Sequence, residues 1–421
     1  MLNNNFSLKN KGVSNFKLTV NEPRHRWYYY KEGFSSDLVQ KAIEDSDIAE
    51  NDLVIDPFNG SGTVTLTSAL SGFNSIGYEV NPFTSFLSKA KLGTISDKKF
   101  LTVKASVLNA CESLTYTSLQ EYSTFSDNGK NRDWLFNPEV LQSFESGWLN
   151  TFKYNGDTRN IMQLALIASA MDNCNARKDG KCLKYKNNWQ ELNLNQETYI
   201  NSLSKRLDEI QSDLQISHII KRAKVECGDS RKIIEKNLKE KFKLCITSPP
   251  YLNTFDYSDI YRPELFLGKF LNKHTDLYDL RLTTVRSHVQ ARWDLPTEND
   301  FGTLYKTALI GIIQKKDILM HKEIPNMIQA YFEDMKNLLC VLKSKAQPDA
   351  SLWMVVSTSA YADIEIPVDL ILAEIGIKQG WYLREIGVLR YVKKRKTKHS
   401  PNINELRESV IIFDNQIRRK I

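Results

Sequence analysis

The sequence contains no long apolar run and no export signal. No stretch of its 421 residues approaches the roughly 18 consecutive apolar residues that a membrane helix needs. The polar start MLNNNFSLKNKG also lacks the apolar middle of a signal peptide. Because 41% of the residues are hydrophobic and 25% are charged, the composition is that of a globular protein. We therefore expect a cytoplasmic protein with no membrane partner.

Paired cysteines are missing as well. The six cysteines, at positions 111, 174, 182, 227, 245 and 340, form no C-x-x-C pair and have no histidine cluster beside them. This spacing disfavours a zinc site and, without an export signal, a disulfide framework. We expect reduced thiols and no bound metal.

Positive charge is concentrated at one end of the chain. The residues from Arg384 onward include eleven Lys and Arg and four Asp and Glu, so this end carries a net charge of +7, equal to that of the whole chain. Its densest part is Lys393, Lys394, Arg395 and Lys396. Such a run is either a solvated loop or a contact for nucleic-acid phosphates.

A glycine-rich turn lies near the start, in NDLVIDPFNGSGTVTLTSALSGFNSIGYEV. Apolar and β-branched residues predict strands over Leu53–Asp56 and Ser75–Val80, and the residues Thr63–Leu70 between them predict a helix. In a right-handed parallel unit of this kind, the turn between the first strand and the helix lies at the carboxyl edge of the sheet. That edge is the usual place for a bound ligand.

The residues of this turn indicate which ligand it suits. Gly60 and Gly62 let the backbone approach a ligand, and Glu79, at the end of the next strand, is placed to hold a ribose. Thr65 stands where a dinucleotide site needs a third glycine, and no lysine follows Gly62 as in a phosphate-binding loop. Asp56 would repel a phosphate but would attract a cationic amino group. The pattern favours a nucleoside cofactor without phosphates.

A second motif follows another apolar strand, in KLCITSPPYLNTF. Proline cannot continue a sheet ladder, and the residue before it is held extended, so Ser248, Pro249, Pro250 and Tyr251 form a stiff loop at a strand end. On its own the tetrapeptide is also compatible with a strand exit and a packed tyrosine.

The two motifs together resemble those of the S-adenosylmethionine-dependent amino-methyltransferases of DNA, which methylate cytosine N4 or adenine N6. DPFNGSGT is similar to their cofactor motif, and TSPPY is similar to their catalytic motif, whose Ser-containing form is most associated with cytosine N4. The resemblance implies an α/β fold with a seven-stranded, mostly parallel, Rossmann-like sheet and helical insertions. The cofactor-binding residues that it implies are Phe34, Ser35, Asp56, Phe58, Gly60, Gly62, Thr63, Glu79, Asp229 and Ser230.

This resemblance gives the second motif a chemical role. An exocyclic amino nitrogen is a poor nucleophile because its lone pair is delocalised into the ring. The Ser248 hydroxyl and the Pro249 carbonyl are placed to accept its two hydrogens, which localises the lone pair. Pro250 adds rigidity, and Tyr251 offers a flat face to a base flipped out of the duplex. Methylation at cytosine C5 is excluded, because it needs a cysteine that follows a proline and none does.

Four functions remain open, and all involve nucleic acid. We expect methylation of double-stranded DNA at cytosine N4, with adenine N6 as the first alternative. An RNA base methyltransferase and a non-catalytic nucleic-acid-binding protein are the others. A cognate restriction endonuclease is compatible with the first two.

The spacing of the motifs predicts two insertions in the core. Far more residues separate Glu79 from Asp229 than one helix and one strand require. We expect core segments at 1–95, 223–255 and 351–421, the last ending in a basic antiparallel hairpin. A mainly helical insertion at 96–222 and a second one at 256–350 would share target recognition. Within them, Asn175–Trp189 is either a basic linker or a nucleic-acid contact, and Arg286, His288, Arg292 and Trp293 are either base readers or packing residues.

Overall fold

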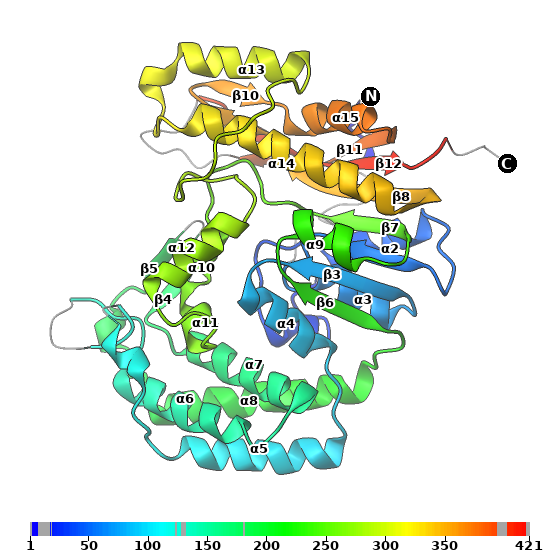
Figure 1. Cartoon of the computed structure of the whole chain (residues 1–421). Helices are drawn as coiled ribbons and strands as arrows, with labels where there is room; N and C mark the ends of the chain where they lie inside the picture. Colours follow the sequence, from blue (N-terminus) through cyan, green and yellow to red (C-terminus); the bar gives the residue numbers. More distant parts are fainter. Residues whose placement is uncertain are drawn as a thin grey trace.

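The fold is built around one twisted sheet. The computed structural model describes residues 2–6, 17, 19–122, 124–127, 132–179, 182–393 and 402–417. Within them, the sheet has the order β6-β3-β2-β7-β8-β12-β11-β1 (Figure 1). Its strands are β1 (Leu2–Asn3), β2 (Leu53–Asp56), β3 (Asn74–Glu79), β6 (Ala223–Cys227), β7 (Phe242–Thr247), β8 (Ala346–Ser357), β11 (Tyr382–Lys393) and β12 (Glu405–Asp414).

The strand directions confirm the predicted α/β class. The neighbours β6, β3, β2, β7 and β8 pair in parallel, and β12 runs antiparallel to both β8 and β11. The two residues of β1 pair with β11 and add an eighth strand to the seven that were expected. Because β2, β3, β6 and β7 point the same way, the residues that follow them meet at one edge of the sheet.

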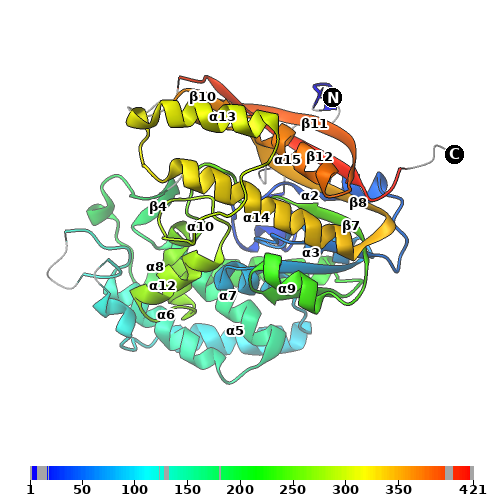
Figure 2. The same cartoon turned by 45° about the horizontal axis from the view of Figure 1, so that its top comes forward.

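Helices cover both faces of the sheet. Val54, Leu244 and Trp353 face α2 (Ser36–Glu44) and α3 (Thr63–Leu70), whereas Ile55 and Cys245 face the opposite side. There α9 (Ser230–Asn237), α14 (Ile324–Lys345) and α15 (Val368–Lys378) lie over the strands (Figure 2). This alternation follows from the period of two in a strand, and it buries the apolar central strands completely.

The first insertion is largely helical. Its long helices are α5 (Asp97–Cys111), α6 (Pro138–Thr151), α7 (Gly156–Asp172) and α8 (Gln196–Ile216). They pack on one another, share an apolar cluster with α4 (Pro82–Leu92), and lie below the sheet in Figure 1. The interpretation of Asn175–Trp189 as a simple linker is wrong, because β4 (Ala176–Asp179) and β5 (Cys182–Tyr185) pair as an antiparallel hairpin, and its contact with nucleic acid stays a prediction.

The second insertion begins with short helices near the carboxyl edge, α10 (Tyr257–Ile260), α11 (Arg262–Leu267) and α12 (His274–Thr283). It continues with α13 (Thr303–Gln314), which packs on α14, α15 and β10 (Ile364–Ile366), and ends with the long helix α14. The core then resumes with β8, the small hairpin of β9 (Ser359–Tyr361) and β10, and α15. The final pair, β11 and β12, is antiparallel as predicted. Across the described ranges, no helix combines the length and apolarity needed to cross a membrane.

A buried carboxylate fastens the first insertion to the segment before α2. Asp213 of α8 is fully buried, and its Oδ2 accepts hydrogen bonds from the Trp27 indole and the Arg24 backbone N–H, both at 2.8 Å. The Arg26 guanidinium pairs with the same carboxylate. Since Tyr30 and Phe34 follow closely in the chain, Asp213 fixes the start of the segment that reaches the carboxyl edge.

Replacement of Asp213 tests this attachment. Asp213→Ala leaves several buried donors without an acceptor, so we expect a loss of about 3–5 kcal/mol in the free energy of unfolding, measured in urea. Asp208→Ala on the same helix is the matched control. The Asp208 carboxylate is exposed and pairs with Lys104, so its removal should cost less than about 1 kcal/mol. Equal losses in the two variants would contradict a specific role for Asp213.

Candidate functional site

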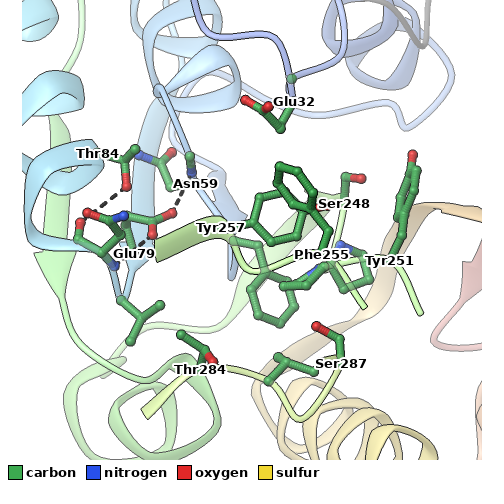
Figure 3. A pocket seen from close by; sticks show the side chains of 18 of the residues that line it. Glu32, Asn59, Glu79, Thr84, Ser248, Tyr251, Phe255, Tyr257, Thr284 and Ser287 are labelled. Atoms are coloured by element: carbon green, nitrogen blue, oxygen red, sulfur yellow. Dashed lines mark hydrogen bonds between the residues drawn. The ribbon is translucent and has the colours of Figure 1, made fainter. Parts of the chain in front are cut away.

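A cavity of about 340 Å³ lies at the carboxyl edge of the sheet. The turn after β2, the end of β3, the turn before α9 and the loop after β7 form its floor, and the segment before α2 closes it from another side. Figure 3 shows side chains from these segments pointing toward a common space. The glycine-rich turn and the Pro-Pro loop, about 190 residues apart in sequence, therefore share one cavity.

Most of the predicted site residues line this cavity. They are Phe34, Asp56, Phe58, Gly60, Thr63, Glu79, Asp229, Ser230, Ser248, Pro249, Pro250 and Tyr251. Ser35 and Gly62 do not. Ser35 is fully buried immediately before α2. Gly62 precedes α3 with φ +86°, and a Cβ there would lie 2.9 Å from the Ser88 hydroxyl, so it shapes the turn.

Glu79 joins the two strands that form the cavity floor. Its carboxylate accepts the Gly60 N–H at 2.7 Å and the Asn81 N–H at 2.8 Å. Burial raises the pKa of Glu79, and these backbone N–H groups act against that rise. The Thr84 hydroxyl and the Val80 N–H bond to the same carboxylate, so a ligand hydroxyl would share or replace one of these contacts.

Small residues bring the turn close to its neighbours. Gly60 has φ +47°, and a Cβ there would lie 3.3 Å from the Tyr30 ring. The side chain of Asn59 packs over Gly77 of β3, where a Cβ would come within 2.3 Å of it. In the part of the chain that the structure describes, the buried Asn59 Nδ2 has no hydrogen-bond partner. Since unpaired buried donors are costly, this amide is suited to bind a ligand acceptor.

Asp56 is buried at the end of β2. Its Oδ1 accepts the Phe58 N–H at 2.9 Å and the Thr247 hydroxyl at 2.8 Å. Burial nevertheless dominates and raises the pKa of Asp56 to about 7. A cationic group in the cavity would favour the ionised form.

Asp229 is held by an ion-pair network that enters the second insertion. The Arg231 guanidinium binds both of its oxygens, at 2.8 Å and 3.0 Å, and also pairs with Asp334 of α14. Arg286 pairs with Asp334 and Glu333 in turn. From the sequence, Arg286 was either a base reader or a packing residue. In the structure its guanidinium forms ion pairs with Glu333 and Asp334. The turn before α9 is thus fastened to α14.

His288 and Trp293 pack against each other. Their ring centroids are 4.6 Å apart, and burial lowers the pKa of His288. His288 lines the cavity and contacts the Thr284 hydroxyl at 3.3 Å. The ring contact between His288 and Trp293 is what we expect of packing residues. His288 nevertheless forms part of the cavity wall.

The Pro-Pro loop is oriented by bonds to the sheet. The Ser248 hydroxyl donates to the Val355 carbonyl of β8 at 3.2 Å and also lies within bonding reach of the Tyr251 hydroxyl. The Tyr251 hydroxyl donates to Glu408 of β12 at 2.7 Å. Both hydroxyl hydrogens are thereby directed away from a ligand.

Aromatic rings complete the cavity wall. Tyr30 stacks on Tyr261 with centroids 5.2 Å apart, and Phe255 meets Tyr257 edge to face at 4.4 Å. The sequence analysis placed none of the additional lining residues Tyr30, Glu32, Asn59, Phe255, Tyr257, Tyr261, Arg390 and Glu408 at the site. Phe255, Tyr257 and Tyr261 could have been found from the sequence, because they closely follow the Pro-Pro motif.

Of the basic segment Lys393–Lys396, which was predicted to contact nucleic acid, the structure describes only Lys393. Lys393 is the exposed last residue of β11 and does not line the cavity. Lys394, Arg395 and Lys396 lie outside the described residues. Throughout those residues the six cysteines are free thiols, and no cluster of three or more His, Cys, Asp or Glu has the geometry of a metal site.

The raised pKa of Asp56 predicts a pH effect on stability. The folded protein binds a proton at Asp56 more tightly than the unfolded chain does, so the contribution of Asp56 to stability is fully present below about pH 4 and is lost as pH rises to about 7. Asp56→Asn keeps the acceptor oxygen but cannot ionise. We expect the wild type to lose up to about 4 kcal/mol relative to this variant between pH 4 and pH 7, in urea unfolding at each pH. Identical pH profiles would contradict the shift.

Comparisons with known proteins agree with the motifs. Residues 6–88, which include the glycine-rich turn and Glu79, match the N6/N4 DNA methylase family. Type II methyltransferase M.BsoBI of Geobacillus stearothermophilus is 26% identical over 462 aligned residues, which cover 96% of this chain and 88% of that protein. Type II methyltransferase M.AvaI of a Nostoc species is 25% identical over 426 residues, which cover 91% and 84%. The family match and these long alignments confirm the predicted resemblance to the N6/N4 methyltransferases of DNA.

Proposed function

We propose that this protein transfers a methyl group from S-adenosylmethionine to the exocyclic amino group of a base in double-stranded DNA, with cytosine N4 as the preferred target. The observation that carries the proposal is the shared cavity, which joins the glycine-rich turn with Glu79 to the loop from Ser248 to Tyr251. Adenine N6 is the alternative target, because both reactions need the same two acceptors.

The cavity fits the cofactor. Glu79 would accept the ribose hydroxyls in place of part of its present contacts, such as that with Thr84, and the unpaired Asn59 Nδ2 offers a donor. In our proposal Asp56, Phe58, Gly60 and Thr63 hold the methionine end, Asp229 and Ser230 flank the adenine, and Phe34 closes the pocket. Ser35 and Gly62 act indirectly, through the shape of the backbone. When bound, S-adenosylmethionine supplies an electrophilic methyl group on a sulfonium.

The chain's own residues prepare the target amino group. Because the Ser248 hydroxyl donates to Val355, its lone pairs are available to accept one amino hydrogen, and the Pro249 carbonyl accepts the other. Two fixed acceptors localise the nitrogen lone pair, and Pro250 keeps them rigid. Tyr251, whose hydroxyl is engaged elsewhere, presents its ring face to the base. The surrounding aromatic rings exclude water.

DNA is favoured over the other partners. The match to a DNA methylase family speaks against RNA, and the complete cavity speaks against a non-catalytic binding protein. The segment Lys393 to Lys396 would contact phosphates, and the insertions at 96–222 and 256–350 would share target recognition. The type II relatives favour a restriction–modification system with a cognate endonuclease.

Identification of the methylated nucleoside tests this function. The protein is incubated with S-adenosylmethionine labelled in its methyl group and either unmethylated genomic DNA or total RNA, and the digested nucleosides are chromatographed. We expect label in N4-methylcytosine from DNA, and at least tenfold less from Ser248→Ala. Label in N6-methyladenine would keep the mechanism but change the base. Label from RNA alone, or none from either, would contradict the proposal.

Paired glycine variants test the cofactor site. Gly60→Ala and Gly72→Ala both strain a residue with positive φ, but a Cβ at Gly72 meets nothing within 4 Å, whereas one at Gly60 crowds Tyr30. We expect Gly60→Ala to weaken S-adenosylhomocysteine binding at least tenfold, by calorimetry, and Gly72→Ala to leave the affinity within about twofold of wild type. Equal affinities in the two variants would place the ligand elsewhere.

A further inference from the structure

The hydroxyl of Tyr251 is bound to a buried carboxylate from a distant strand. Glu408 belongs to β12, lies 157 residues further along the chain, and is 3% exposed. Its Oε1 accepts the Tyr251 hydroxyl at 2.7 Å. A carboxylate removed from water requires partners, so this bond stabilises both groups.

The other oxygen of Glu408 is taken by Arg390. The Arg390 Nε donates to Oε2, and the two residues are direct partners in the β11–β12 register. Arg390 stands next to a break in that register, between Val388 and Arg390, and its side chain remains 38% exposed. Both Arg390 and Glu408 line the cavity. A chain of bonds therefore runs from the terminal hairpin to the tyrosine of the Pro-Pro loop.

An ion pair elsewhere on the same hairpin shows what a purely structural contact looks like. Arg384 of β11 donates to Asp414 of β12 at 2.7 Å, and Asp414 also accepts the Ser351 hydroxyl of β8 at 3.0 Å. Neither Arg384 nor Asp414 lines the cavity. The Arg384–Asp414 ion pair therefore joins strands of the sheet to one another. The Arg390–Glu408 ion pair instead connects the sheet to the Pro-Pro loop, through the Tyr251 hydroxyl.

We propose that Glu408, held by Arg390, is a positioning residue that fixes the ring of Tyr251 for stacking on the flipped base. The inference rests on the proposed function, since it concerns how that site receives its target. With its hydroxyl bound to Glu408, the Tyr251 ring keeps one orientation before the base arrives. A preset ring avoids the entropy cost of ordering a side chain on binding. In this proposal Glu408 acts on the base through the Tyr251 ring.

A double-mutant cycle separates positioning from folding. Tyr251→Phe keeps the ring and removes the hydroxyl, Glu408→Ala removes the acceptor, and a third variant combines them. The readouts are KM for DNA, kcat, and the fluorescence of a base analogue at the target position. We expect each single change to raise KM and weaken the fluorescence response about tenfold, with S-adenosylhomocysteine affinity within about twofold of wild type. The double variant should be no worse than either single one.

Two controls make the outcome specific. Asp414→Asn perturbs the other ion pair of the hairpin and should leave KM and the fluorescence response unchanged. Glu408→Gln retains an oxygen acceptor and should restore most of the loss seen in Glu408→Ala. Additive losses in the double variant, or an equal loss in Asp414→Asn, would overturn the positioning role. A wild type that binds cofactor but never methylates DNA would instead overturn the proposed function.

Discussion

The site depends on the hydrogen bonds between the Glu79 carboxylate and two backbone N–H groups. One comes from Gly60 in the turn after β2, and the other from Asn81 at the start of α4. The Gly60 bond ties the turn after β2 to the end of β3, and the Asn81 bond fixes the Glu79 side chain within its own turn, so that together they shape the glycine-rich turn. The turn also needs room: a Cβ at Gly77 would collide with Asn59, and one at Gly60 would crowd Tyr30. The Glu79 carboxylate and the missing Cβ atoms of Gly60 and Gly77 together shape the floor of the cavity.

The remaining walls are brought to this floor by contacts over long distances in sequence. Asp213 fastens the segment before α2 to the first insertion, and Arg231 joins the turn before α9 to α14 in the second. Glu408 ties the Pro-Pro loop to the terminal hairpin. The insertions thus contribute to the cavity wall as well as to the predicted recognition surface. In the proposed function, this arrangement would let one cavity serve both a cofactor and a flipped base.

Local signals in the sequence predicted the core well. The strand Leu53–Asp56 and the helix Thr63–Leu70 are found with the predicted bounds, because β-branched runs, the glycine turn and the helix stop after Leu70 are all local. Ser35 was predicted as a direct ligand contact from a motif position alone, yet it is buried behind the cavity wall. The β4–β5 hairpin was missed although Asp179-Gly180 is a strong hairpin turn signal. Glu408 had no local signal, since its role arises from tertiary contact.

The central claim is that the cavity at Glu79 holds the nucleoside of the cofactor beside the Pro-Pro loop. A crystal structure of the protein with S-adenosylhomocysteine tests it most directly. The account predicts that both ribose hydroxyls lie within hydrogen-bond distance of the Glu79 carboxylate, with the sulfur facing the loop from Ser248 to Tyr251. A ligand bound outside this cavity, or one whose ribose makes no contact with Glu79, would contradict it.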